Sequence, residues 1–484
     1  MLIGLTAVGI IYLPVWHGDA AIYLPYVRSL WERGRWMEFN LGEMSSGATS
    51  PLWLLWLLPW YGLFGVMGLK VAGGIMVLLA VLAAYGQALR IGMSVWEALL
   101  PAAVVAYCVA PAGFLGYETP LAALVSIAWA GLIPPEDTVA KQRPWVGLMA
   151  ALTPLVRPEM AILVGVYALV MLFRRRCPLL PWLLVGGIIG LLYYGWMHLA
   201  TGSFSASSYC RSFALREMAE LRVWGFSFHL GLLMELLRSG LLFVAAGAVV
   251  GGWFRRAQWQ APQWQFMILS FIAYALFFTL VAPVNAVRYL APVAFSAGSM
   301  ALWGLERLGP IRSWVMSGFL LLLVLNLAAR TLDDRRRGYE FERVTERECA
   351  EVLNTIAEPG ATVLVYEVQI RWWLKPELRV LSLDGVIDGK VAPYLDSGDL
   401  AAFLWRYRPQ YWIANEAVWR RPFLRRSFLA EVLALGTDSV ERAGIRFVRL
   451  YTWPPERLPR GFYGCLALYR LSYTERGVSS DAVR

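Results

Sequence analysis

Two carboxylates in the polar stretch 17–50 stand where they could do chemistry. Asp19 comes directly after the first apolar segment, and a carboxylate at such a boundary can act as a general base on a hydroxyl group. Asp19 also precedes a helical pattern over residues 20–33. Aspartate is common at the N-cap of a helix, so a purely structural role is the alternative. Glu43 could hold hydroxyl groups of a bound molecule, or it could cap the turn that follows it.

Further acids and arginines stand at the ends of later apolar segments, where ionisable groups are costly and tend to be functional. The acids are Glu118 and Glu159, and the arginines are Arg157 and Arg288. A further arginine, Arg211, lies in the loop 200–238 beside Tyr209. A planar guanidinium can bind two oxygens of a phosphate group, which is the chemistry that these arginines would offer. The structural alternatives are an arginine that reaches lipid headgroups and a salt bridge such as Arg157 with Glu159.

These residues belong to a chain with the composition of a polytopic membrane protein. Of its 484 residues, 58% are hydrophobic and 16% are charged, which excludes a soluble or a disordered chain. The net charge of +10 predicts no nucleic-acid partner, because arginines in the loops between apolar segments set membrane topology. The five cysteines and three histidines show no metal-binding spacing. The lipid bilayer is therefore the first predicted partner, and we expect the first segment to be an anchor and not a cleaved signal.

The apolar segments have lengths suited to crossing a bilayer. They lie at about 1–16, 51–67, 70–89, 95–112, 119–134, 144–156, 158–173, 179–199, 239–254, 264–283, 289–305 and 314–330. Basic residues occupy every second junction from Arg90 onward, which predicts that these junctions are cytoplasmic and that the tail lies outside. Segment 51–67 leaves two arrangements open. If it spans, there are twelve spans and residues 17–50 are cytoplasmic; if it lies along the interface, there are eleven and 17–69 is one outside loop.

Beyond residue 332 the composition becomes that of a small α/β domain over residues 340–484. Strand patterns occur at 361–367, 379–383, 410–414, 445–451 and 465–471, and a helical pattern occurs at 399–407. No Gly-rich turn of the phosphate-binding type leads from a strand into a helix. We therefore expect this domain to position a bound molecule and not to carry the chemistry.

Four motifs, in this order, resemble those of the GT-C glycosyltransferases. The first loop carries F-N-x-G-E-x-x-x-G-x-T-S-P-L-W over residues 39–53, after Asp19. Gly116–Leu121, Leu155–Glu159 and Arg288–Pro292 look like the family's G-M-E-T-P-L, L-A-R-P-E and R-Y/F-L-x-P elements. Within the superfamily, the chain resembles the decaprenyl-phosphoryl-arabinose-dependent arabinofuranosyltransferases and their bacterial relatives. The resemblance covers residues 1–330 and extends to the tail only in its general α/β layout.

The resemblance implies a fold, a topology and an activity. In GT-C enzymes the first loop is extracytoplasmic and contains juxtamembrane helices, so 51–67 is expected to be interfacial. Residues 1–332 would then form a domain of about eleven transmembrane helices with a long first outside loop, 17–69, and the α/β domain 340–484 would also lie outside. The protein would reside in a bacterial inner membrane with its site facing the periplasm. It would transfer a sugar from a polyprenyl-phosphate donor to an extracytoplasmic glycan, lipid or protein acceptor.

The resemblance also assigns roles to residues. Asp19 would be the general base of a transfer that inverts the anomeric carbon. The expected substrate-binding residues are Glu43, Glu118, Arg157, Glu159, Tyr209, Arg211, Arg288 and Tyr289. Some GT-C branches use a divalent cation, and Asp19, Glu43 and Glu118 would suit Mg²⁺ or Ca²⁺ through oxygen ligands if they converge. The sequence leaves the metal open, as it does the sugar, the acceptor and the linkage.

One position departs from the family pattern. Gly18 stands where these enzymes usually carry the first of two adjacent acids, so Asp19 is alone. This departure gives weight to a non-catalytic GT-C-like protein of envelope assembly as an alternative. A lipid or sugar transporter is a further alternative, although no inverted repeat of broken helices is evident.

Overall fold

The computed structural model describes residues 2–16, 19–133, 139–175, 177–205, 261–278, 287–387, 389–415, 422–458 and 466–474. The chain divides into two compact units. The helical unit comprises Met1–Val15, Thr49–Trp196 and Arg222–Arg335, and the sheet unit comprises Trp16–Ala48, Met197–Leu221 and Arg336–Arg484. The first loop, up to Ala48, therefore belongs to the same unit as the C-terminal part of the chain.

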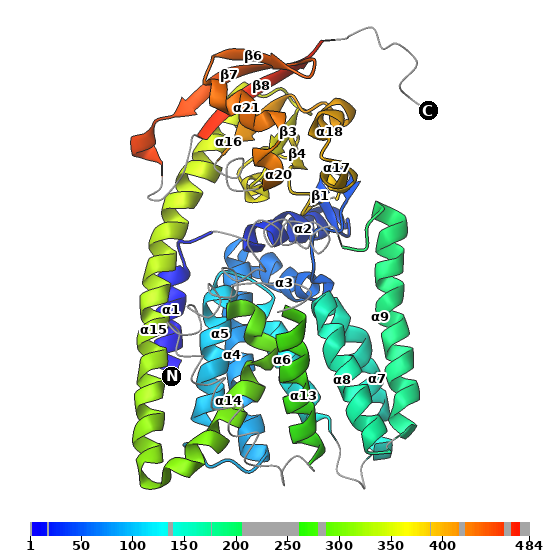
Figure 1. The fold of residues 1–484 in the computed structure, drawn as a ribbon, viewed down its shortest axis with the longest axis vertical. Coiled ribbons are helices and arrows are strands. Elements are labelled where there is room, and N and C mark those ends of the chain that lie inside the picture. The colour runs from blue at the N-terminus through cyan, green and yellow to red at the C-terminus, as the bar shows by residue number, and fades with distance from the viewer. Residues whose placement is uncertain are drawn as a thin grey trace. The chain divides into compact units, whose positions relative to one another are not determined.

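The described part of the helical unit is built from apolar helices, which Figure 1 draws as coiled ribbons. The described helices are α1 (Leu2–Tyr12), α3 (Pro51–Phe64), α4 (Met67–Arg90), α5 (Leu99–Phe114), α6 (Thr119–Gly131), α7 (Val139–Val156), α8 (Ala161–Phe173), α9 (Leu180–Thr201), α13 (Pro262–Leu276), α14 (Ala291–Leu305) and α15 (Arg312–Phe341). Short 3₁₀ turns, η2 (Pro158–Met160) and η7 (Val287–Leu290), precede α8 and α14. The charged run at 333–337 lies inside α15, so that helix continues past the predicted end of the membrane part.

Small residues let the central helices of this unit approach closely. A Cβ atom on Gly73 of α4 would lie 1.8 Å from the carbonyl oxygen of Gly113 in α5, which no side chain can do without moving the helix. A Cβ atom on Gly298 of α14 would lie 2.7 Å from the Cα atom of Pro101 in α5. Close backbone approach through small residues is the usual way in which membrane helices associate. Helix α5 is accordingly buried along most of its length.

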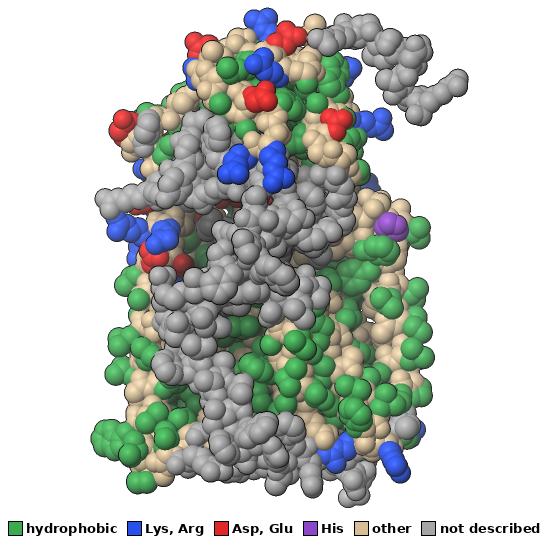
Figure 2. All heavy atoms as spheres, in the orientation of Figure 1, with side chains coloured by type: hydrophobic (Ala, Val, Ile, Leu, Met, Phe, Trp, Pro, Cys, Tyr) green, Lys and Arg blue, Asp and Glu red, His purple; other side chains and the backbone are tan. Residues whose placement is uncertain are grey.

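Three described helices are long and apolar enough to cross a bilayer by length and composition: Met67–Arg90, Leu180–Thr201 and the helical run Leu308–Ile356. On the face seen in Figure 2, hydrophobic side chains cover much of the helical unit. Helix α9 exposes a row of large apolar side chains, including Leu184, Ile188, Leu191 and Leu199. An exposed apolar surface of this kind is suited to lipid. The prediction of a helical membrane part followed by a sheet domain is confirmed in this coarse form.

Several finer expectations stay predictions. The number of spans, the side on which each loop lies and the interfacial position of 51–67 are among them. Helix α3 does form there, as a short apolar helix whose N-cap Ser50 accepts a hydrogen bond from the backbone N–H of Trp53. The predicted span 239–254 lies outside the described residues. The proposed domain boundaries, 1–332 and 340–484, also remain predictions.

The sheet unit contains a six-stranded mixed sheet in the order β4-β3-β5-β8-β7-β6. The strands are β3 (Thr362–Val365), β4 (Arg379–Ser382), β5 (Tyr411–Ala414), β6 (Ser439–Arg442), β7 (Ile445–Trp453) and β8 (Leu466–Tyr473). The helices of its C-terminal part are α16 (Cys349–Ile356), α17 (Ala392–Ser397), α18 (Leu400–Tyr407), α20 (Pro422–Arg425) and α21 (Phe428–Leu435). Five strands and α18 occur where the sequence predicted them, whereas β6 was missed because it is short and largely exposed.

The first loop supplies α2 (Asp19–Arg33) and a small hairpin of β1 (Glu38–Asn40) and β2 (Glu43–Met44) to this unit. The Asn40 side chain donates to the carbonyl oxygen of Val380 and accepts from its N–H, each at 2.9 Å. Val380 lies on β4, an edge strand, so the amide satisfies backbone groups that a further strand would otherwise pair. Seven residues after Asn40, Gly47 packs so tightly that an added Cβ atom would lie 2.6 Å from the Cα atom of Ile387.

Asn40→Ala should loosen the edge of the sheet. The substitution leaves two buried backbone groups of Val380 without partners, which costs about 2–4 kcal/mol in the free energy of local opening. Amide hydrogen exchange of the peptide that contains β4 should speed up accordingly. Leu41→Ala is the matched control because Leu41 is 55% exposed. Equal exchange at β4 in the two variants would show that the loop does not hold this edge.

Candidate functional site

A buried ion-pair cluster in the helical unit is built around Arg157. This residue joins α7 to η2 in an extended conformation, as expected before Pro158. Its Nε atom lies 2.7 Å from Glu159 Oε1, and its Nη1 atom lies 3.4 Å from Glu118 Oε1. Only 7% of Arg157 is exposed. One guanidinium therefore faces two carboxylates within a largely apolar set of helices, where an uncompensated charge would be costly.

The Glu118 side chain is oriented toward Arg157 and not toward the start of the α6 helix, which its backbone position would let it cap. It is the N-cap residue of α6, and its side chain makes no capping hydrogen bond. The carboxylate thus does not accept a hydrogen bond from a backbone N–H at the helix start, which is the usual partner there, and it pairs with the guanidinium of Arg157 instead. The ion pair fixes the turn before α6 relative to the turn before α8.

Arg288 adds a second guanidinium, which lies over tyrosine rings. Its Cζ atom is 4.9 Å from the ring centroid of Tyr117 and 5.2 Å from that of Tyr289. Arg157 Cζ is 4.7 Å from the same Tyr289 ring, so this tyrosine contacts both arginines. Arg288 is half-buried, whereas Arg157 is buried. Of the two arginines, Arg288 is the more accessible to a ligand.

The cluster brings together segments that carry three of the four sequence motifs. Glu118 comes from Gly116–Leu121, Arg157 and Glu159 come from Leu155–Glu159, and Arg288 and Tyr289 open the last motif. The end of the first-loop motif also reaches this region, since Trp53 Nε1 donates to the carbonyl oxygen of Gly116 at 2.9 Å. Residues far apart in the sequence thus meet at one place in the helical unit.

The remaining expected site residues are not part of the Arg157 cluster as the structure describes it. The backbone of Asp19 begins α2 in the sheet unit. Glu43 is also in the sheet unit, where its carboxylate lies 2.6 Å from Arg379 Nη2 and 3.0 Å from Lys390 Nζ. Burial alone would raise the pKa of Glu43, but these two basic groups outweigh it and lower the pKa below its ordinary value. Tyr209 and Arg211 lie outside the described residues.

The carboxylates expected to suit a cation are engaged by basic side chains where they are described. Glu43 is paired with Arg379 and Lys390, and Glu118 is paired with Arg157. In the described part of the chain, no three His, Cys, Asp or Glu residues gather as a metal-binding group. We therefore assign no reaction step to a metal.

Two tyrosines near the cluster were not singled out from the sequence. Tyr117 stacks under Arg288, and its position beside Glu118 in a motif was a signal that could have identified it. Tyr274 on α13 is fully buried, and its hydroxyl has no hydrogen-bond partner among the residues that the structure describes. The Tyr274 side chain interacts electrostatically with the charged groups of Glu159 and Arg157. Nothing in its aromatic-rich helix distinguishes Tyr274 from packing residues.

An apolar groove of about 420 Å³ lies along α1 and α4 in the same unit. Its walls carry mainly aliphatic side chains, with Phe114 of α5 among them. The ammonium of Lys70 stands in this lining and donates to the carbonyl oxygens of Tyr12, at 2.7 Å, and Val15. The groove has the size and apolar character of a small-molecule or lipid-chain site.

Arg157→Gln should destabilise the helical unit by about 3–5 kcal/mol, because two buried carboxylates would lose their counter-charge. Combining it with Glu118→Gln and Glu159→Gln should restore part of that loss, since the triple variant buries no uncompensated charge. Thermal unfolding in detergent measures both effects. Arg175→Gln, at an exposed arginine, is the control. A triple variant less stable than Arg157→Gln would rule out charge compensation as the role of this pairing.

Among known proteins, similarity to this chain is found in solved structures and not in sequence comparisons. No known family profile and no curated protein sequence matches the chain. The solved structures that resemble it include ArnT from Cupriavidus metallidurans bound to undecaprenyl phosphate, with a TM-score of 0.61, 14% identity and 97% of both chains covered. The apo form of that ArnT gives a TM-score of 0.60 at 13% identity, again over 97% of both chains.

A more distant likeness is to the oligosaccharyltransferase of Archaeoglobus fulgidus in complex with Zn and sulfate. Its TM-score is 0.51 at 13% identity, and the match covers 86% of this chain and 68% of that one. At these identities the likeness concerns the fold. The chain has the GT-C glycosyltransferase fold, as its sequence motifs predicted.

Proposed function

We propose that the chain is a membrane glycosyltransferase that transfers a sugar from a polyprenyl-phosphate donor to an acceptor outside the cytoplasm. The observation that carries this proposal is the fold likeness to ArnT bound to undecaprenyl phosphate over 97% of both chains. The convergence of motif residues around Arg157 supports it, because a fold alone does not imply an activity. The protein would act in a bacterial inner membrane with the sheet unit on the periplasmic side.

In this proposal Arg288 contacts the donor phosphate and Arg157 positions its neighbours. Departure of the sugar leaves a phosphate monoester whose growing negative charge a guanidinium stabilises. Arg288 suits this role because it is half-buried and held by aromatic rings. Arg157 is already paired with two carboxylates and is better suited to orienting Glu118, Glu159 and Tyr289. Tyr209 and Arg211 remain candidate donor contacts on sequence grounds.

The apolar groove along α1 and α4 supports a lipid-linked donor. A polyprenyl chain is a branched hydrocarbon, and it gains most from a groove with aliphatic walls. We assign the groove to the binding of part of the polyprenyl hydrocarbon of the donor.

Asp19 acts as the general base in the proposed reaction. The acceptor hydroxyl oxygen attacks the anomeric carbon while the bond from that carbon to the phosphate oxygen breaks. The hydroxyl proton passes to the Asp19 carboxylate, and the polyprenyl phosphate leaves with the bonding electron pair. Attack from the face opposite the leaving group inverts the anomeric carbon. The sheet unit, of which the α2 helix is part, would hold the acceptor.

The alternative of a non-catalytic GT-C-like protein rests on one observation. Gly18 replaces an acid that the resembling enzymes usually carry beside Asp19. A scaffold without catalysis would retain the fold and the buried ion pairs, which stabilise the structure in either case. Activity measurements on Asp19 variants separate the two functions.

Asp19→Asn should reduce transfer by about 10²-fold or more, because an amide cannot accept the proton of the acceptor hydroxyl. Asparagine can still cap a helix, so a capping role predicts little change. The assay incubates the purified protein with a panel of polyprenyl-phosphate sugars and detects released polyprenyl phosphate.

The matched control for that variant is Asp399→Asn. Asp399 caps α18 by accepting from the N–H of Ala402 at 2.9 Å, and we expect it to tolerate the same change without loss of transfer. Parent activity in Asp19→Asn at saturating donor and acceptor would refute the general-base assignment. A separate outcome, in which the parent reacts with no donor in the panel, would favour the non-catalytic function.

Arg288→Gln should raise the KM for the donor by about 10- to 100-fold, since a hydrogen bond to a charged group contributes about 1.5–3 kcal/mol. The KM for the acceptor should stay within about twofold of the parent. Steady-state kinetics in nanodiscs give both constants, with Arg175→Gln as the control. A change confined to the acceptor KM would contradict the phosphate assignment.

A further inference from the structure

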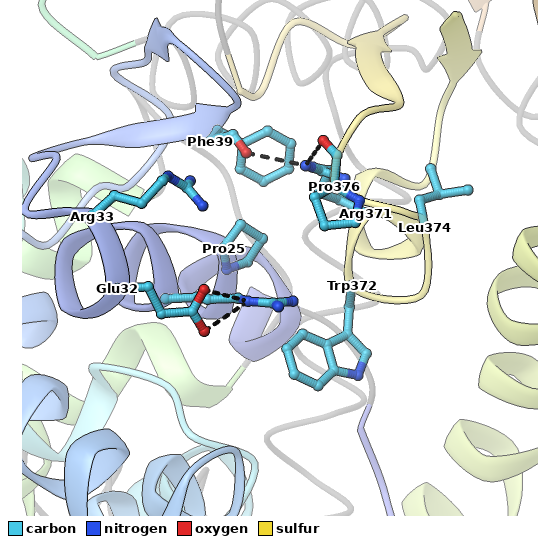
Figure 3. A pocket seen from close by; sticks show the side chains of 9 residues that line it. Pro25, Glu32, Arg33, Phe39, Arg371, Trp372, Leu374 and Pro376 are labelled. Atoms are coloured by element: carbon cyan, nitrogen blue, oxygen red, sulfur yellow. Dashed lines mark hydrogen bonds and ion pairs between the residues drawn. The ribbon is translucent and has the colours of Figure 1, made fainter. Parts of the chain in front are cut away.

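A small cavity of about 80 Å³ lies within the sheet unit, between the first loop and the C-terminal part of that unit (Figure 3). Three arginines contribute to its wall: Arg28 and Arg33 from α2, and Arg371 from the 3₁₀ turn η10 (Val368–Trp372). The rest of the lining is Glu32 and a set of apolar or aromatic side chains that includes Phe39 and Trp372. Figure 3 shows the Arg371 side chain beside Phe39, with the Trp372 indole on another side of the space.

Arg371 is buried, and its hydrogen-bond partners are carbonyl oxygens. Its exposed fraction is 9%, and its guanidinium donates to the carbonyl oxygens of Phe39, Lys375 and Pro376 at 3.4, 3.1 and 3.0 Å. In the described part of the chain it forms no ion pair. A guanidinium has five N–H groups, so these three bonds leave part of its donor capacity unused.

The neighbouring arginines make it less favourable for the buried guanidinium of Arg371 to carry its charge. Burial first, and then the charges of Arg28 and Arg33, lower the pKa of Arg371 to about 10, although the carboxylate of Glu377 acts in the opposite direction. The group still carries its charge at neutral pH. Arg28 is paired with Glu32 at 3.0 Å, and Arg33 donates to Glu38 at 2.9 Å. Two of the three guanidiniums thus have an ion-pair partner, whereas Arg371 has none among the described residues.

We propose that this cavity binds the carboxylate of an acidic sugar in the acceptor glycan, with Arg371 as its main partner and Trp372 under the sugar ring. The inference rests on the proposed function and specifies the class of acceptor. Among the described residues Arg371 has no ion pair, and the carboxylate of a ligand can supply that partner. A planar guanidinium and a carboxylate share a bidentate geometry. The indole offers an apolar face to the C–H groups of the ring, while the small cavity admits the charged substituent and not a whole oligosaccharide.

Binding of simple probes tests the proposal without any transfer reaction. The full-length protein in nanodiscs is titrated with methyl β-glucuronide, methyl β-glucoside and inorganic phosphate, and binding is followed by saturation-transfer NMR. We expect the glucuronide to bind at least 10-fold more tightly than the glucoside. Arg371→Gln should remove that preference. Trp372→Ala should weaken both sugars and leave the preference for the glucuronide in place.

Two further variants keep the result interpretable. Arg371 holds three carbonyl groups, so its loss could also disturb folding; Arg28→Gln removes a cavity charge from a side chain that is 43% exposed and should weaken glucuronide binding about threefold. Arg406→Gln, at an exposed arginine of α18 away from the cavity lining, should bind like the parent. Thermal unfolding checks that each variant is folded.

Three outcomes would overturn the proposal: equal binding of glucuronide and glucoside, a preference that persists in both folded Arg371→Gln and Arg28→Gln, or Arg371-dependent binding of phosphate alone. The result is separable from the proposed activity. Sugar transfer by the parent together with glucuronide binding that ignores Arg371 would defeat only this inference. Arg371-dependent glucuronide binding with no transfer from any donor would defeat only the proposed activity.

Discussion

A charge buried among apolar helices must find its counter-charge there, and in the helical unit Arg157 finds two. The pairing with Glu118 and Glu159 joins the turn before α6 to the turn before α8, and the Tyr289 ring brings in the turn before α14. Without those contacts the guanidinium would have no compensation for the loss of water. The ends of several helices are thereby held at one place, and this is where a ligand could meet Arg288.

The sequence singled out several members of this cluster but not their arrangement, and their roles in a reaction stay predictions. Glu118, Arg157, Glu159 and Arg288 were singled out because ionisable residues at the ends of apolar segments need a reason. Their meeting could not be derived from spacing, since it depends on how α6, α8 and α14 pack. The structural alternative of an Arg157–Glu159 salt bridge was also foreseen and does form, with Glu118 as a second partner. Tyr274 escaped notice because a buried tyrosine in an aromatic-rich helix has no distinguishing pattern.

In the first loop, motif residues that look functional from their types also make tertiary contacts within the sheet unit. Asn40 and Glu43 belong to the family-like signature, and both contact the C-terminal part of the sheet unit through side-chain bonds. Gly47 is required by the close approach of Ile387. Local sequence patterns predicted most strands of the sheet, because alternation and turns are local properties. That a loop near residue 40 covers the edge of a sheet formed after residue 360 is a tertiary fact that no local pattern contains.

Lys70 has a consequence for the way the protein is made. Its ammonium supplies hydrogen bonds to the carbonyl oxygens of Tyr12 and Val15, at the end of α1, where a helix leaves its own carbonyls unsatisfied. The partner comes from α4, more than fifty residues later in the chain. During synthesis, α1 is therefore made more than fifty residues before the group that completes its end. Helix α1 can reach its final state only after α4 has joined it, so the folding of these two helices is coupled.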